Sequence, residues 1–375
     1  MKILMSGCLA IASVLLSLQT TQAEQQWIYI ASPAKPAVIY RCTLDLQTGA
    51  FGKLEIAAEN VNTGFMAMHP TESILYAGTT EKVKRGVPNG FVRAYHLDKK
   101  SGHLKQFSIA PTEDKGVTHI EVSPLGNVVL TCHYSGEGTS AIPLKKNGEL
   151  VQKVSRIKHE GSGGTKRQTR PHPHGVAIHK EGKFVCVADL GNDHIEVFGI
   201  SPEGELSKCS RWQSAPGAGP RHVSFHPNGK WLYCINELDN TLVLLDFDAS
   251  CGKLKEVQAI NTLPEGYKET SYTAEIAIHP NGKYLYGSNR GHNSTVVCQI
   301  NQNNGKLSVV EHEPTQGDHP RFIGIDPTGS IYLAANMNAN SIVSFHVDKK
   351  TGALKPSGHT LEVARPMCVL FVEKK

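Results

Sequence analysis

Short apolar segments and polar turns alternate along this chain in a pattern that repeats. Four stretches, which begin at His174, Arg221, Ala274 and Arg321, can be laid on one another. Each contains an apolar segment, a turn such as HPNGK or DPTGS, a second apolar segment, a polar cluster and a third apolar segment. Two weaker copies run through residues 66–80 and 120–134. Apolar segments of this length bounded by turn residues predict β-strands.

The turns recur at intervals of 47–56 residues, at His69-Pro70, Ser123-Pro124, His179-Lys180, His226-Pro227, His279-Pro280 and Asp326-Pro327. Self-similarity at this period, with strand-like segments throughout, is typical of a β-propeller. No window of a dozen residues beyond the first 23 carries the apolar period of a helix, which argues against a doubly wound α/β fold.

The two ends of the repeat region predict how the ring closes. Six units follow the order strand, turn, strand, loop, strand, turn, strand. The segment before them supplies only three strands, within 27–32, 37–45 and 52–60, and the chain ends in one isolated strand, PMCVLFV, at 366–372. Joining that strand to the first three completes a seventh blade and leaves no open sheet edge. We therefore expect an all-β, seven-bladed β-propeller with four antiparallel strands per blade.

The first residues have the composition of a leader. Lys2 is followed by an apolar run from Ile3 to Leu18 and then by Thr21-Gln22-Ala23, which predicts a signal peptide over 1–23 and a propeller domain over 24–375. A membrane anchor is less favoured, because the run is short and no later segment could span a bilayer. The chain is therefore expected to be exported, to the periplasm or the medium.

Charge and cysteine usage narrow the possible partners. The net charge is only +5 and no aromatic–basic motif accompanies it, so a nucleic-acid partner is not expected. Most cysteines lie inside apolar strand patterns, where a buried thiol is the ordinary explanation. Cys209 and Cys251 lie nearer the blade edges and could pair in an oxidising compartment, although spacing does not determine connectivity. The sequence does not determine the oligomeric state.

Positions that break the repeat are candidates for the functional site, because a propeller brings equivalent positions of every blade around one axis. Just before the first strand three blades carry the small residues Gly64, Thr118 and Ala274, but three others carry His174, Arg221 or Arg321. One step later, two blades carry His222 and Glu275. Just after the second strand, two blades carry apolar residues and two carry Glu237 and Arg290. We expect these charged groups to converge in one cleft on one face.

The residue types in this cleft indicate its chemistry. Arginines grip carboxylate or phosphate oxygens, and histidine and glutamate exchange protons near neutral pH. No activated serine or cysteine nucleophile is evident, and the pair His172 and His174 lacks a third metal ligand, so neither a metal nor another cofactor is expected. The basic, glycine-rich loop 156–174 and the loop 266–275 are candidates to cover the site.

The segments PHPHGVAIHKEGKFVCVADLG, GPRHVSFHPNGKWLYCINELDN, AEIAIHPNGKYLYGSNRGHN and HPRFIGIDPTGSIYLAANMN resemble those of the seven-bladed propeller lactonase family. That family includes propeller-type 6-phosphogluconolactonases and a 3-carboxy-cis,cis-muconate lactonizing enzyme. The resemblance covers essentially the whole of 24–375. The active-site set proposed in the lactonizing enzyme, one histidine, two arginines and one glutamate, corresponds here to His174, Arg221, Arg290 and Glu237.

The resemblance implies a lactone hydrolase that acts on a small anionic lactone or sugar acid. Arg221 and Arg290, with Arg321, His222 and Glu275, would bind the substrate, and Glu237 or His174 would be the general base. Two alternatives remain at this stage. One is a cycloisomerase of a muconate-type lactone with the same residues, and the other is a non-catalytic exported propeller that binds a carbohydrate or a protein.

Overall fold

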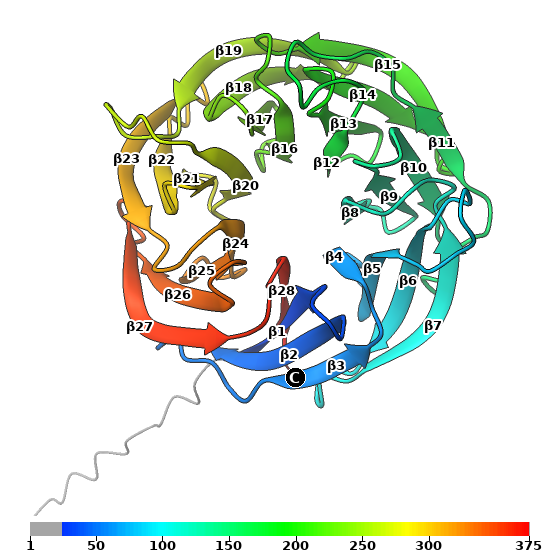
Figure 1. The fold of residues 1–375 in the computed structure, drawn as a ribbon, viewed down its shortest axis with the longest axis horizontal. Helices are drawn as coiled ribbons and strands as arrows, with labels where there is room; N and C mark the ends of the chain where they lie inside the picture. Colours follow the sequence, from blue (N-terminus) through cyan, green and yellow to red (C-terminus); the bar gives the residue numbers. More distant parts are fainter. Residues whose placement is uncertain (1–24, 375) are drawn as a thin grey trace, which may run out of the picture.

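In the computed structural model, which describes residues 25–374, the chain forms seven four-stranded antiparallel sheets around a central axis (Figure 1). This arrangement confirms the all-β, seven-bladed propeller expected from the repeat. The predicted signal peptide, 1–23, lies outside the described residues. The described part contains no helix long and apolar enough to cross a membrane.

Strands at the same depth in each blade form concentric rings (Figure 1). The innermost strands are β28 (Cys368–Glu373), β4 (Thr63–Met68), β8 (His119–Val122), β12 (Pro173–Ile178), β16 (Pro220–Phe225), β20 (Tyr272–Ile278) and β24 (Pro320–Ile325). The second strands are β1 (Gln25–Ser32), β5 (Ile74–Thr80), β9 (Val128–Cys132), β13 (Phe184–Asp189), β17 (Trp231–Asn236), β21 (Tyr284–Arg290) and β25 (Ile331–Asn336).

The two outer rings complete the blades. The third strands are β2 (Val38–Asp45), β6 (Gly90–Leu97), β10 (Gly138–Pro143), β14 (His194–Ile200), β18 (Thr241–Asp248), β22 (Ser294–Ile300) and β26 (Ser341–Val347). The outermost strands are β3 (Glu55–Glu59), β7 (Leu104–Pro111), β11 (Ser155–Lys158), β15 (Leu206–Gln213), β19 (Lys253–Asn261), β23 (Leu307–Pro314) and β27 (Leu354–Glu362).

The ring closes as the chain ends predicted. β28 pairs antiparallel with β1 from Ala31 opposite Cys368 to Gln26 opposite Glu373, and so becomes the innermost strand of the first blade. Hydrogen bonds rather than a covalent link therefore join the two ends of the chain, and the first blade has no free inner edge.

Buried tyrosines form hydrogen bonds between neighbouring blades. Tyr29, Tyr76, Tyr233 and Tyr286 occupy the same place on the second strand of their blades, and each donates its hydroxyl proton to a turn glycine of the next blade at 2.7–2.8 Å. The acceptors, Gly102, Gly148, Gly305 and Gly352, all have φ between +72° and +77°, which glycine adopts without strain. The tyrosine and the turn glycine therefore form one inter-blade joint that the repeat reproduces.

The turn histidines of the repeat also form hydrogen bonds between blades. His69, His179, His226 and His279 each place Nε2 2.8–3.1 Å from the carbonyl oxygen of a turn glycine in the next blade. Their Nδ1 atoms accept hydrogen bonds from backbone N–H groups of their own turns. These histidines are satisfied structural residues, which explains why the HP turn recurs without belonging to a site.

Candidate functional site

β-Bulges set the direction of the site residues. Five inner strands lose register near their first residue, and the residues in the bulges are Gly64, His174, Arg221, Ala274 with Glu275, and Arg321. A bulged residue is left out of the ladder, and its side chain is re-aimed. The bulge therefore recurs at the same place in five blades, and His174, Arg221 and Arg321 are the large polar residues that occupy it.

Close packing of inner strands supports this arrangement. A Cβ atom on Gly175 of β12 would lie 2.6 Å from the carbonyl oxygen of Arg221 and 2.9 Å from Cα of His222. Only a residue without a side chain lets β12 and β16 approach this closely. Gly175 thus holds His174 against the neighbouring blade.

The carboxylate of Glu237 is shared by three arginines. Its Oε2 accepts a hydrogen bond from Nε of Arg221 at 3.0 Å and forms an ion pair with Nη2 of Arg290 at 2.9 Å. Its Oε1 lies 2.8 Å from Nη1 of Arg167. Glu237 follows β17 directly, whereas the three arginines come from β16, from the end of β21 and from the loop 156–174, so the cluster joins three segments around one carboxylate.

The charges around Glu237 keep it ionised. Burial acts to raise the pKa of this carboxyl group, but the positive charges of Arg290, Arg221 and Arg167 outweigh burial and lower the pKa to about 2. Both of its oxygens are engaged in ion pairs. A carboxylate in this state holds arginines well but accepts a proton poorly.

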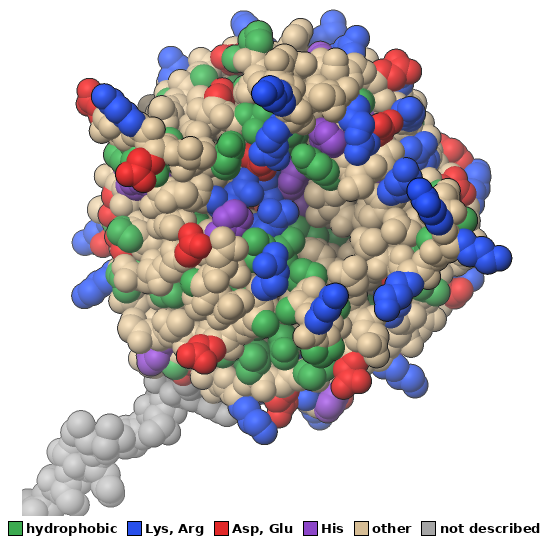
Figure 2. Space-filling view, in the orientation of Figure 1, with side chains coloured by type: hydrophobic (Ala, Val, Ile, Leu, Met, Phe, Trp, Pro, Cys, Tyr) green, Lys and Arg blue, Asp and Glu red, His purple; other side chains and the backbone are tan. Residues whose placement is uncertain are grey.

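The cluster carries more positive charge than Glu237 balances. Arg321 forms no ion pair within 4.0 Å among residues 25–374. Burial and the neighbouring arginines lower the pKa of both Arg221 and Arg321. The buried Nε of Arg290 has no hydrogen-bond partner among residues 25–374. Figure 2 shows a hollow at the centre of one face, where basic and histidine side chains gather beside hydrophobic ones.

Histidines form a second layer of the site. The rings of His174 and His222 are 5.1 Å apart between centroids, and Nδ1 of His222 lies 2.7 Å from Oε1 of Glu275. All three residues are buried. Within residues 25–374, Nδ1 of His174, Nε2 of His222 and Oε2 of Glu275 have no hydrogen-bond partner.

Burial sets the protonation of this layer. Burial and the positive charge of Arg221 lower the pKa of both His174 and His222 well below the ordinary histidine value, so both rings are neutral near pH 7. Burial raises the pKa of Glu275 to about 7, against the opposing effect of Arg221. Each neutral imidazole keeps one nitrogen without a hydrogen-bond partner among residues 25–374, whereas both oxygens of Glu237 are engaged by arginines.

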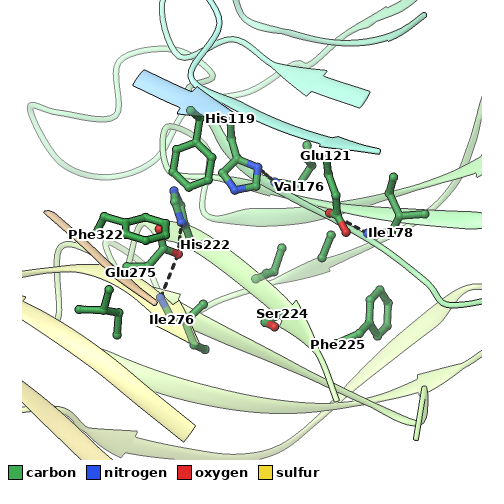
Figure 3. A pocket seen from close by; sticks show the side chains of 14 residues that line it. His119, Glu121, Val176, Ile178, His222, Ser224, Phe225, Glu275, Ile276 and Phe322 are labelled. Atoms are coloured by element: carbon green, nitrogen blue, oxygen red, sulfur yellow. Dashed lines mark hydrogen bonds and ion pairs between the residues drawn. The ribbon is translucent and has the colours of Figure 1, made fainter. Parts of the chain in front are cut away.

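A cavity of about 330 Å³ continues down the channel from the histidine layer (Figure 3). Its upper lining includes Phe65, His119, His222, Glu275 and Phe322. Its lower lining comes from the inner strands β8, β12, β16, β20 and β24. The channel is therefore open for some distance behind the histidines rather than filled by core side chains.

The structure brings together all seven residues singled out by the repeat. Arg221, Glu237, Arg290 and Arg321 interact electrostatically as one cluster, and His174, His222 and Glu275 lie beside it.

Arg167 and His119 were not identified individually from the sequence. Arg167 belongs to the loop 156–174 that was expected to cover the site, and its guanidinium lies 5.7 Å from the ring centroid of Tyr272. His119 packs 4.9 Å from the ring of His222. The basic composition of the loop was a signal for Arg167, whereas nothing in the repeat marked His119.

His172, which the sequence placed beside His174 as a possible metal ligand, has structural partners. His172 stacks on Tyr134 with ring centroids 4.2 Å apart, and its Nδ1 lies 2.8 Å from the carbonyl oxygen of the same tyrosine. Among residues 25–374, no three His, Cys, Asp or Glu side chains are grouped closely enough to hold a metal ion.

Comparison with known proteins gives consistent matches over nearly the whole chain. The family described as "Lactonase, 7-bladed beta-propeller" matches residues 27–371. The 6-phosphogluconolactonase of Bacillus subtilis is 32% identical over 336 residues, which are 90% of this chain and 95% of that protein. The 6-phosphogluconolactonase of Pectobacterium carotovorum is 29% identical, with 92% and 98% of the two chains covered.

Solved structures agree with this arrangement. A Bacteroides fragilis protein superposes with a TM-score of 0.83 at 28% identity, covering 94% of this chain and 99% of that one. The periplasmic gluconolactonase of Pseudomonas aeruginosa superposes with a TM-score of 0.87 over 94% and 100% of the two chains. Its 24% identity is evidence for the fold alone.

Proposed function

The chain belongs to the seven-bladed β-propeller lactonase family, and on this premise we propose that it hydrolyses a small anionic sugar lactone in the cleft lined by Arg221, Arg290 and Arg321. It is a 6-phosphogluconolactonase-like lactonase and hence a carboxylic-ester hydrolase. The identity of its lactone and the roles of its residues are part of the proposal.

The observation that carries the proposal is the excess of arginines over carboxylates. Three arginines share Glu237, and Arg321 has no ion-pair partner within the described residues. Buried guanidinium groups without a counter-ion favour an anion, and their planar donors suit carboxylate or phosphate oxygens. The free Nε of Arg290 supplies one such donor. A lactone with a phosphate or carboxylate group would supply the missing charge.

The reaction follows from the position of these groups. Water adds to the lactone carbonyl carbon, the carbonyl oxygen becomes an oxyanion, and the ring C–O bond then breaks to give a hydroxy acid. Arg221 and Arg290 stabilise the oxyanion, because fixed cations in a buried site act strongly on charge that develops in the transition state. The neutral ring of His174 accepts a hydrogen bond from the attacking water. Glu237 holds the arginines in place rather than taking the proton.

A panel of lactones tests this proposal. Purified 24–375 should accelerate hydrolysis of 6-phosphogluconolactone and of unphosphorylated gluconolactone above the uncatalysed rate, with the larger kcat/KM for the anionic substrate because the cleft carries excess positive charge. Acid release in a weakly buffered solution measures both rates. A muconate-type lactone and its open-chain acid belong in the same panel. Turnover of these alone would favour the cycloisomerase, and binding of a sugar acid without any turnover would favour the non-catalytic alternative.

Export is a separate part of the proposal and rests on the leader-like composition of residues 1–23. Its structural consequence concerns Cys209 on β15 and Cys251 in the turn between β18 and β19 of the next blade. Both are exposed, and Sγ of Cys209 lies 3.1 Å from the carbonyl oxygen of Cys251. The other cysteines among residues 25–374 are buried.

We expect Cys209 and Cys251 to form a disulfide in exported protein, as the two thiols lose two protons and two electrons to a disulfide oxidant such as oxidised glutathione. A thiol reagent applied to the folded protein should label two cysteines in 24–375 made in the cytosol. It should label none in the exported chain, whose mass should be lower by two hydrogen atoms. Labelling of both cysteines in exported protein would contradict the pairing, and a chain that keeps its leader and stays in the cytosol would contradict export.

A further inference from the structure

Among residues 25–374, the contact between His222 and Glu275 is the only carboxylate–imidazole pair that involves His174 or His222. Nδ1 of His222 lies 2.7 Å from Oε1 of Glu275, and the same oxygen accepts a hydrogen bond from the backbone N–H of Ile276 at 3.1 Å. The backbone N–H of Glu275 donates to the hydroxyl of Ser288 at 3.0 Å. Two contacts therefore hold Oε1 of the carboxylate, and Ser288 holds the backbone of the same residue.

This pair determines which nitrogen of His222 is available. When Glu275 is ionised, its oxygen can only accept, so Nδ1 of His222 carries the proton and donates it. Nε2 then bears a lone pair. Figure 3 shows the ring of His222 between Glu275 and the aromatic side chains at the top of the cavity, with its second nitrogen directed away from the carboxylate.

The ring of His222 packs against that of His174, and each ring has one nitrogen without a hydrogen-bond partner. Nε2 of His222 and Nδ1 of His174 are buried and lack hydrogen-bond partners among residues 25–374, and the two rings are 5.1 Å apart. Buried polar atoms are nearly always paired with protein, ligand or water, so unpaired atoms at one place point to a polar guest. A water molecule between two imidazoles would satisfy both nitrogens.

His174 and His222 differ in what stabilises their protonated forms. Within the described residues, His174 has no carboxylate partner, and Arg221 and Arg321 disfavour a positive charge on its ring. The same arginines also disfavour a positive charge on the ring of His222, but the carboxylate of Glu275 lies at hydrogen-bond distance from it. A carboxylate that holds an imidazole also stabilises the imidazolium formed when the ring takes a proton.

We propose that His222, positioned by Glu275, is the general base that removes the proton from the attacking water, while His174 only orients that water. The inference rests on the proposed lactone hydrolysis. The water oxygen bonds to the carbonyl carbon as its proton moves to Nε2 of His222. The ring C–O bond then breaks, and the proton passes from His222 to the departing ring oxygen, so the imidazole is neutral again at the end of the cycle.

The ionisation of Glu275 should then control the rate. Burial raises the pKa of Glu275 to about 7. The base-competent form has Glu275 ionised, so kcat/KM should rise as the pH rises through about 7 and level off above it. The titratable groups that face this pair from the surrounding strands are His119, His174, Arg221, Glu237, Arg290, Arg321, Tyr332 and Cys368. Glu237, with its pKa lowered to about 2, stays ionised near pH 7. The two histidines among them have lowered pKa values, and the arginines, tyrosine and cysteine do not change charge near pH 7.

Three variants test the pair. Glu275→Gln can keep both contacts of Oε1 but removes the charge, and should lower kcat/KM at pH 8 by about 10- to 100-fold and abolish the rise near pH 7. His222→Gln removes the base and should cost about 100-fold or more. The double variant should be no slower than His222→Gln alone, because Glu275 acts only through His222.

Glu121 provides the matched control. It is a second glutamate of the same channel, and burial raises its pKa to about 8, but its Oε2 accepts a hydrogen bond from the backbone N–H of Ile178 at 3.1 Å rather than contacting a histidine. Glu121→Gln keeps an acceptor for that N–H and should retain wild-type kcat/KM and the rise near pH 7.

Each result decides a different point. Wild-type protein without lactone turnover rejects the proposed function and this inference with it. If the wild type is active, either a pH-independent kcat/KM between pH 6 and 8 or an unchanged profile in Glu275→Gln overturns the inference alone. Multiplicative losses in the double variant also overturn it. The wild-type profile needs no variant, so the inference can be tested even if a substitution prevents folding.

Discussion

Replacing Arg290 with alanine is expected to lower kcat/KM for the lactone about 1,000-fold, the upper range for loss of one oxyanion donor. Arg290 is the last residue of β21, and its Nη2 forms an ion pair with Oε2 of Glu237 at 2.9 Å and donates a hydrogen bond to the carbonyl oxygen of Thr273. These contacts fix the guanidinium and leave its buried Nε without a partner among residues 25–374. The substrate oxyanion is the partner we assign to that donor.

Arg290→Lys separates charge from geometry. Lysine keeps the positive charge but lacks the planar set of donors that can hold Glu237, Thr273 and the substrate at once. We expect a loss of about 10- to 100-fold for this variant, intermediate between alanine and the wild type. Initial rates over a range of lactone concentrations measure kcat and KM separately.

Arg211 on the exposed outer strand β15 is the control for a general effect of losing one positive charge. Arg211→Ala should hydrolyse the lactone at the wild-type rate. A kcat/KM for Arg290→Ala within about threefold of that control would remove Arg290 from the mechanism, since even a weak donor to the transition state contributes more.

The repeat was sufficient to predict the fold and the way the ring closes. Equivalent short strands and turns recur in six units, and the unpaired strand at 366–372 had one plausible place, beside the first blade. These features are local or strictly periodic, so one sequence contains them. The same periodicity distinguished the structural histidines of the turns, which recur from blade to blade, from His174, which does not recur.

The geometry within the site was less accessible from the sequence. The bulges at His174, Arg221 and Arg321 depend on how each inner strand pairs with its neighbour, and no local composition predicts the register of that pairing. Arg167 lies in a loop without a period, so its contact with Glu237 could not be specified in advance.

The site has two parts, the arginine cluster around Glu237 and the histidines with Glu275, because binding an anion and transferring a proton need carboxylates in different states. The arginine cluster needs an ionised carboxylate to hold it, and Glu237 supplies that charge at the cost of its basicity. Proton transfer needs groups outside those ion pairs, which the neutral histidines provide together with Glu275, whose pKa burial raises to about 7. One glutamate could not serve both purposes, because three arginines that keep it ionised also make it a weak base.

Replacing Glu237 with glutamine is expected to abolish most of the activity and to destabilise the protein as well. Without the carboxylate, Arg221, Arg290 and Arg167 repel one another and lose their common acceptor. We expect kcat/KM to fall about 100- to 1,000-fold, since the donors to the oxyanion are displaced. Removing one partner of a buried ion pair typically costs about 3 kcal/mol of unfolding free energy.

The pH dependence of that stability loss follows from the pKa of Glu237. Its pKa is about 2 in the folded protein, compared with about 4.5 for an unperturbed glutamate. A lowered pKa in the folded state contributes stability that is present above about pH 4.5 and is lost as the pH falls towards 2. The difference in unfolding free energy between the wild type and Glu237→Gln should therefore be largest near neutral pH and shrink below about pH 4.5.

Glu137→Gln is the matched control, because Glu137 also bridges two cations but lies away from the axis. Its oxygens are 2.8 Å from Nη1 of Arg170 and 3.1 Å from Nζ of Lys158, and its side chain is 23% exposed. Partly exposed pairs contribute at most about 1 kcal/mol, so this variant should keep wild-type turnover and nearly wild-type stability. Denaturant unfolding between pH 3 and 8, followed by tryptophan fluorescence, measures the stability of all three proteins. If Glu237→Gln matches Glu137→Gln in both turnover and stability, Glu237 does not organise the arginine cluster.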